Sequence, residues 1–371
     1  MPSVGPTIAR PTDFCQAGIG QPLFTPQDLL RELPIFTESV YKKRPLGFSN
    51  ATRFNMGGTG FFHQFYIWML VRALKPAHII ESGAYNGLGT WQLRQAAPQA
   101  QIIVVSPQTP HLYVDHKPNS LYFTAEHFRD FASIDWNCVP GLDRERTLVF
   151  IDDHQSGYRR MLEAHARGFR HQMYDDNAMP AKGDHFSAKG ACAASKGMVN
   201  GLQAWDDFRG IVADWGRWRH GSYFNVTAGQ LHKVGQSFSK VIETYEEMPP
   251  IWTSPLSRPD APRPLMSGGE AARFIASQDK DTLRAQFHEA RAYGYFLYLR
   301  TKPLDQAPAR DLFYPRHVTA NGYSGIQGSF KGKGEDCEGK SGVSPKHLKI
   351  TRQGDDFKRN YGAGLRFALT L

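Results

Sequence analysis

Two short apolar segments of this chain each end in a pair of aspartates, and no other feature limits the possible folds as strongly. The segments are TLVFIDDHQ, from Thr147 to Gln155, and GFRHQMYDDN, from Gly168 to Asn177. The residues between them, GYRRMLEAHARG, have the spacing and composition of one amphipathic helix. The sequence therefore predicts a strand–helix–strand unit in which both strands end in acid.

Parallel strands joined in this way end at the same edge of their sheet, and ligands of parallel α/β sheets bind just beyond that edge. Four carboxylates gathered there would repel one another and raise one another's pKa values, unless a cation or hydrogen-bond donors balanced them. We therefore treat this edge as the strongest candidate for a functional site.

The sequence around this unit also alternates between short apolar runs and helical segments. Four further strands are expected, in AHIIESG (Ala77 to Gly83), QIIVVSP (Gln101 to Pro107), SLYFTA (Ser120 to Ala125) and KVIETYEEMPPIW (Lys240 to Trp252). Such alternation is typical of an α/β fold with a doubly wound, mostly parallel sheet. Helices outside this pattern are expected from Thr25 to about Leu33, from Phe61 to Leu74 and from Ser267 to about Tyr293. The second of these is apolar nearly all round, so we interpret it as a core helix.

At 371 residues the chain is long enough for one large domain with appendages. We expect four parts: an N-terminal lead-in and helix (1–60), the α/β domain (61–254), a helical extension (255–320) and an irregular Gly- and Lys-rich tail (321–371).

Composition excludes several classes of protein. The aromatic stretch 61–74 is too short to span a bilayer, and no secretory signal pattern opens the chain. The four cysteines (Cys15, Cys138, Cys192 and Cys337) are scattered without a CxxC pair, so we expect neither structural zinc nor a disulfide framework, and a cytoplasmic location. The net charge of +9 comes without a dense basic stripe, so neither a nucleic acid nor a membrane is expected as a partner.

A glycine-rich turn follows the first expected strand, in IIESGAYNGLGTW. Glycine lets a backbone turn tightly and approach a ligand closely, although a plain strand–helix turn also needs it. The spacing E-x-G-x-x-x-G-x-G differs from the G-x-G-x-x-G of dinucleotide folds. It resembles motif I of class I S-adenosylmethionine-dependent methyltransferases. The resemblance implies that Glu81, Gly83, Ala84 and Gly87 line S-adenosylmethionine and that Gly89 opens the next helix.

One position departs from that family. Its members usually have an acidic residue at the end of the second strand, which binds the ribose hydroxyls. Here the strand ends in VVSPQ, which places Ser106 there. Ser106 or the nearby Gln108 can hydrogen-bond a hydroxyl, but more weakly than a carboxylate does.

The acidic strand ends resemble those of metal-dependent O-methyltransferases, both the catechol-type enzymes, which have Asp and then Asp-Asn, and the group of macrolide-sugar and rhamnosyl enzymes and cephalosporin-hydroxylase-like proteins, which has Asp and then an acidic pair. The resemblance implies a metal site with Asp152, or Asp153, as the first ligand. Asp176 is expected as the second ligand, with Asp175 and Asn177 competing for the third place. Ligation by oxygen alone suits Mg²⁺, or Mn²⁺, rather than zinc.

Other polar residues near these strand ends have open roles. His154 is a candidate general base, because its ordinary pKa suits proton transfer, or it forms a hydrogen bond in a turn. Asp153 is as consistent with a helix N-cap or a solvent-facing acid as with ligation. Lys182, Asp184 and His185 follow the fifth strand, where an acceptor-binding loop would lie, but a plain surface loop is the simpler interpretation.

The leading hypothesis is a metal-assisted transfer of a methyl group from S-adenosylmethionine to a hydroxyl of a sugar or glycosylated small molecule. One alternative is a non-catalytic methyltransferase-like protein that serves in binding or assembly, favoured by Ser106 and the unusual tail. Another is a different metal-dependent transferase acting on sugar nucleotides. The sequence leaves homo-oligomer formation open.

Overall fold

The structure is a computed structural model that describes residues 19–45, 48, 59–177, 186–196, 209–212, 222–225, 228–252, 264–266, 268–290 and 296–314. Its centre is a seven-stranded sheet in the order β3-β2-β1-β4-β5-β9-β8. The strands are β1 (His78–Ser82), β2 (Gln101–Ser106), β3 (Ser120–Thr124), β4 (Thr147–Ile151), β5 (His171–Tyr174), β8 (Ile242–Glu247) and β9 (Leu297–Thr301). Strands β1 to β5 pair in parallel, and β9 pairs antiparallel with both β5 and β8. The predicted mostly parallel α/β fold is confirmed.

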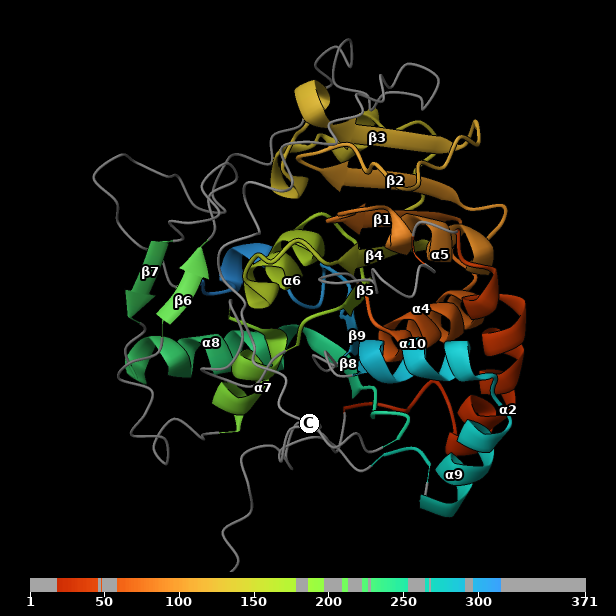
Figure 1. Cartoon of the computed structure of the whole chain (residues 1–371). Helices are drawn as coiled ribbons and strands as arrows, with labels where there is room; N and C mark the ends of the chain where they lie inside the picture. Colours follow the sequence, from red (N-terminus) through yellow and green to blue (C-terminus); the bar gives the residue numbers. More distant parts are fainter. Residues whose placement is uncertain are drawn as a thin grey trace, which may run out of the picture.

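Helices cover both faces of the sheet, which makes the fold doubly wound (Figure 1). One face carries α2 (Pro26–Ser39), α4 (Phe61–Leu74), α5 (Leu88–Ala96), α9 (Gly268–Ala276) and α10 (Lys280–Ala290), and the other carries α6 (Gly157–Ala166), α7 (Ala188–Ser195) and α8 (Ala228–Val241). Alternate strand residues point to opposite faces, so that Ile79 packs in the first layer and Ile80 in the second. A separate antiparallel pair, β6 (Arg209–Val212) and β7 (Ser222–Asn225), completes the described strands.

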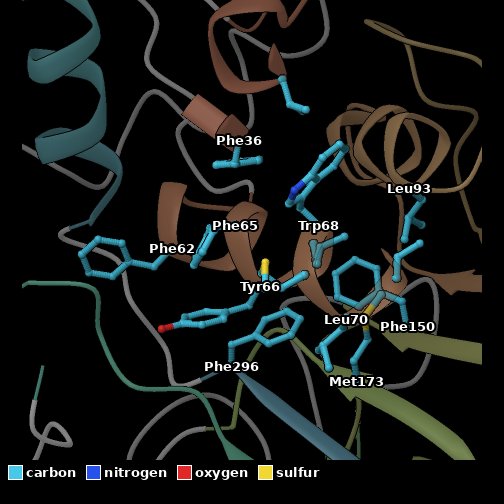
Figure 2. Packing of buried hydrophobic residues seen from close by; sticks show 14 of the residues in the cluster. Phe36, Phe62, Phe65, Tyr66, Trp68, Leu70, Leu93, Phe150, Met173 and Phe296 are labelled. Atoms are coloured by element: carbon cyan, nitrogen blue, oxygen red, sulfur yellow. The ribbon is translucent and has the colours of Figure 1, made fainter. Parts of the chain in front are cut away.

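Helix α4 is the core helix that the sequence predicts. Every residue from Phe61 to Val71 is buried. Figure 2 shows its side chains Phe65, Tyr66, Trp68 and Leu70 between Phe36 of α2 and the sheet residues Phe150 and Met173, with Phe296 beside them, while Phe62 points away to one side. A fully buried large apolar side chain contributes roughly 1.5–3 kcal/mol, so this layer is a main source of stability.

Helix α2 begins as predicted and ends later. Thr25 caps it: the main-chain N–H of Asp28 donates to Oγ1 of Thr25, and the Asp28 carboxylate accepts from the main-chain N–H of Thr25. The expected end at about Leu33 is wrong, since the helix continues through Pro34 to Ser39. Burial of Phe36 in the α4 layer offsets the hydrogen bond that Pro34 cannot donate.

The sheet takes a strand from the region expected to form only a helical extension. Helices α9 and α10 lie there, but β9 follows them and inserts between β5 and β8, so the sheet extends beyond residue 254. A buried ion pair holds α10 against the N-terminal part, with Nη1 of Arg44 2.6 Å from Oε1 of Glu289. The tail 321–371 lies outside the described residues.

The cysteines correct one expectation. Both cysteines in the described ranges, Cys138 and Cys192, are disulfide-bonded and buried. The expectation that the cysteines form no disulfides is therefore wrong for these two, because spacing along a chain says little about which thiols meet in space. Among the described residues, no helix combines the length and the apolar character that a membrane crossing requires.

Candidate functional site

The carboxyl ends of three neighbouring strands bring the acidic residues together, as the sequence predicts. Ser82 pairs with Ile151 across β1 and β4, and Ile151 pairs with Tyr174 across β4 and β5. The strand order also reverses between β1 and β4, since β2 and β3 extend the sheet on one side of β1, and β4 and β5 on the other. Ligands of open α/β sheets bind at such a switch point, beyond the carboxyl ends of its strands.

Asp153 does not face this edge. Its carboxylate accepts hydrogen bonds from Nε of Arg160 at 2.8 Å and from Oγ of Ser82 at 2.6 Å. The side chain is fully buried. Asp153 is therefore neither a solvent-facing acid nor the cap of α6, whose N-cap is Ser156.

Asp175 turns toward helix α4. Nδ1–H of His63 donates to Oδ1 of Asp175 at 2.6 Å, and both residues are buried. Burial alone would lower the pKa of His63, but the charge of Asp175 and this hydrogen bond raise it above the ordinary value, with a smaller contribution from Asp176. His63 and Asp175 therefore form a buried, hydrogen-bonded pair within the protein.

Asn177 belongs to a buried polar network. Its Nδ2 donates to the hydroxyl of Tyr245 at 2.9 Å, and its Oδ1 accepts from the main-chain N–H of Lys189 at 2.8 Å. Lys189 in turn forms an ion pair of 2.7 Å with Glu247. The network joins the end of β5 to α7 and β8.

The remaining acids form a cluster with His154. Asp152, His154 and Asp176 each offer one ligand atom, and these atoms all lie within 4.8 Å of one another. Nδ1 of His154 is 3.6 Å from Oδ2 of Asp176, and both side chains are about one third exposed (35% and 34%). Burial raises the pKa of Asp152 well above its ordinary range, and the negative charges of Asp175, Asp176, Glu81 and Asp153 add to the rise.

This donor set fits a divalent cation. Ligand bonds of about 2.1 Å place the donor atoms about 3–4 Å apart, so small rotations of the three side chains would complete the set. Of the four residues expected to bind metal, Asp152 and Asp176 lie together in this cluster. Asp175 and Asn177 instead form hydrogen bonds with His63 and Tyr245. His154, expected as a base, is the third member of this cluster.

The glycines of the turn are required by close approach of the chain to itself. Gly83 and Gly87 have φ values of +94° and +93°, which side chains rarely adopt. A Cβ on Gly83 would lie 2.0 Å from the carbonyl oxygen of Asp152, and one on Gly89 would lie 2.3 Å from Oε1 of Glu81. The turn after β1 is therefore packed directly on the residues that follow β4. Ala84, between the glycines, is buried.

Glu81 lies beneath the first turn of α5. Its Oε2 accepts a hydrogen bond from Oγ1 of Thr90, while Oε1 has no hydrogen-bond partner in the structure. Burial raises the pKa of Glu81 to about 8, although the hydrogen bonds from Thr90 oppose the rise. A buried acceptor left without a donor fits a ligand that brings one.

Ser106 is buried at the end of β2. It lies beside the glycine turn, since the carbonyl oxygen of the preceding residue, Val105, accepts a hydrogen bond of 2.8 Å from the main-chain N–H of Gly83. Gln108 is exposed. Lys182, Asp184 and His185 lie outside the described residues.

The sequence does not predict the residues that bind Asp153, Asp175 and Asn177. Arg160 occupies the middle of a helix whose sequence indicates only an amphipathic helix. His63 lies in a helix that is apolar nearly all round, and a histidine in such a helix is the one available signal. Lys189 lay in a segment without a recognised motif.

Comparisons with known proteins give weak likenesses. No family model matches the chain, and no curated protein matches it by sequence. Among solved structures, a protein from Klebsiella pneumoniae with the provisional description O-methyltransferase is 15% identical, with a TM-score of 0.27 over 43% of this chain. The chain covers 66% of that protein, just under two thirds of its length. The SAH-bound methyltransferase PaMTH1 from Podospora anserina is 12% identical, with a TM-score of 0.29 over 81% of this chain and 98% of that one.

Proposed function

We propose that the protein is an S-adenosylmethionine-dependent methyltransferase that uses a divalent cation held by Asp152, His154 and Asp176. The observation that carries the proposal is the meeting of these three ligand atoms within 4.8 Å, at the point where the strand order reverses. The glycine turn lies directly against the same residues, since Gly83 packs on the main chain of Asp152.

Charge supports the cation. Asp153 and Asp175 have buried hydrogen-bonding partners, Arg160 and His63, inside the protein. Asp152 has instead a pKa raised by burial and by four neighbouring carboxylates, so its ionised form is disfavoured in this environment. A divalent cation would reverse that balance and hold Asp152 ionised.

The chain's own residues have distinct tasks in this proposal. Asp152, His154 and Asp176 hold the cation, which, when bound, orients an acceptor hydroxyl and lowers its pKa. Glu81 offers its unpartnered Oε1 to a donor of the cofactor, such as the amino group of S-adenosylmethionine. The main chain around Gly83 packs on that of Asp152 and so fixes the distance between the glycine turn and the residues that would hold the cation. The acceptor that we propose is a sugar or glycoside hydroxyl, because of the resemblance of the acidic strand ends.

Calorimetry tests the proposal. The purified protein is titrated with S-adenosylmethionine, with and without an excess of Mn²⁺ or Mg²⁺ over the protein. The ligand concentrations span about 1 μM to 1 mM, the range of affinities that is usual for enzymes and their substrates. We expect binding of both ligands, weaker cofactor binding in Glu81→Ala, which removes the unpartnered Oε1, and loss of Mn²⁺ binding in Asp152→Ala. Absence of cofactor binding at millimolar concentration would remove the methyltransferase function.

A second candidate is a methyltransferase-like protein that binds a partner without catalysis. The observation that favours it is Ser106, a neutral residue where the family has an acid. The two functions differ in the calorimetry: the second candidate requires that S-adenosylmethionine fails to bind while the protein stays folded.

A further inference from the structure

A histidine of helix α4, His63, contacts the acidic edge of the sheet. His63 belongs to α4, the core helix that precedes the sheet, and contacts Asp175 across 112 positions of sequence. Its side chain is 3% exposed and that of Asp175 is 11% exposed, so the 2.6 Å contact is shielded from water. The His63 ring also lies against Phe296, with ring centroids 5.7 Å apart, which restricts its orientation.

This contact anchors one side of Asp176. Asp175 is held by His63, and Asn177 is held by the main chain of Lys189 and by Tyr245. Asp176 therefore lies between two neighbours whose side chains are fixed by buried partners on different elements. Its own carboxylate is the member of this triplet that meets Asp152 and His154.

We propose that His63 is a positioning residue for the cation site, and this inference rests on the proposed function. By holding the Asp175 carboxylate toward α4, His63 keeps that acid out of the cation site and fixes the chain direction that presents Asp176. Residues that orient metal ligands in this way typically change metal affinity by about 10- to 100-fold when mutated.

The experiment compares Mn²⁺ affinity in the full chain, measured by calorimetry and by the Mn²⁺ EPR spectrum. His63→Leu removes the hydrogen bond. His63→Asn keeps a donor, because the Asn amide nitrogen lies near the place of Nδ1. The matched control is His171→Leu, since Nδ1 of His171 also forms one hydrogen bond, 2.8 Å to the hydroxyl of Tyr298, but at the far end of β5.

We expect His63→Leu to weaken Mn²⁺ binding at least ~10-fold and to broaden the EPR spectrum of the Mn²⁺ that stays bound. The Mn²⁺ affinity of His63→Asn should stay within a few fold of that of the wild type, and the affinity of His171→Leu should be unchanged. Wild-type affinity in folded His63→Leu overturns the inference and leaves the cation site standing. Equal weakening in His171→Leu also overturns it, since the loss would then be a general effect of destabilisation. A wild-type protein that binds no Mn²⁺ removes the cation site itself, and the inference with it. If His63→Leu does not fold, His63→Gln replaces it, because the Gln amide nitrogen lies near the place of Nε2 and is directed away from Asp175.

Discussion

Nε of Arg160 donates a hydrogen bond of 2.8 Å to Oδ2 of Asp153, and the two side chains are 1% and 0% exposed. Arg160 also binds Asp130 and Glu163, so one guanidinium serves three carboxylates. Asp152, the preceding residue, belongs instead to the cluster with His154 and Asp176, the cation site that we propose. The two adjacent aspartates therefore have different partners, and we expect different roles for them, one in stability and one in the site.

The first prediction uses this pair. Asp153→Asn should lower the free energy of unfolding by about 2–4 kcal/mol, because it breaks a buried ion pair. Asp152→Asn should leave that free energy unchanged or raise it, since the ionised form of Asp152 is disfavoured by burial and by its acidic neighbours. Urea denaturation at pH 7 measures the free energy of unfolding of both variants. A stability loss in Asp152→Asn equal to that in Asp153→Asn would contradict the division of roles.

The second prediction concerns the glycine turn. Gly83→Ala should destabilise the fold by more than about 4 kcal/mol, because it combines a positive φ with a Cβ 2.0 Å from the carbonyl oxygen of Asp152. Gly141 also has a positive φ, +69°, but nothing lies within 4 Å of its Cβ position. Gly141→Ala should therefore cost only about 1–2 kcal/mol of backbone strain. Thermal unfolding of both variants tests the contrast, which fails if the two behave alike.

The third prediction is a dependence of stability on pH. Burial raises the pKa of Glu81 from the ordinary 4.5 to about 8, so in that window the folded state retains a proton that the unfolded chain releases. The contribution of Glu81 to the free energy of unfolding is complete below pH 4.5. It falls as the pH rises toward 8, by up to roughly 5 kcal/mol.

Glu81→Gln removes this titration. The variant should gain stability over the wild type between pH 5.5 and pH 8.5, as measured by urea denaturation at about those two values. The control is Glu126→Gln, at a side chain that is 76% exposed, which should follow the wild type. A constant difference between Glu81→Gln and the wild type across the window would refute the assignment.

The fourth prediction concerns the metal. Oxygen ligands alone suit Mg²⁺, but the cluster contains the imidazole of His154, a ligand that transition metals prefer. Mn²⁺ should therefore bind at least ~10-fold more tightly than Mg²⁺. His154→Asp should narrow that ratio toward one, whereas Asp176→Asn should weaken both ions. Equal affinities in the wild type would exclude His154 as a ligand.

The sequence predicts the local part of the fold well. The acid-ended strands, the helix between them and the capped start of α2 depend on short-range patterns, such as the apolar run before Asp152 and the Thr25–Asp28 box. It does not predict β9, because a run as short as LYLRT becomes a strand only through its pairing with β5 and β8.

The same limit applies to the site. The sequence predicts that four aspartates meet at one edge, but cannot say which of them face it. That choice depends on Arg160 for Asp153 and on His63 for Asp175, and the second partner lies more than 100 residues away. Likewise, the glycine pattern predicts a tight turn, while its packing on Asp152 requires the three-dimensional structure.

The place of β9 in the sheet has a consequence for biosynthesis. A nascent chain can form β1 to β5 with their helices long before Leu297 leaves the ribosome, yet β5 then has an unpaired edge, because its partner on that side is β9. Exposed strand edges promote aggregation, and pairings distant in sequence form slowly. Chains that stall or are cleaved before β9 therefore leave β5, the strand that Asp175 and Asp176 follow, without its neighbour, so β9 is needed to protect the sheet next to the proposed cation site.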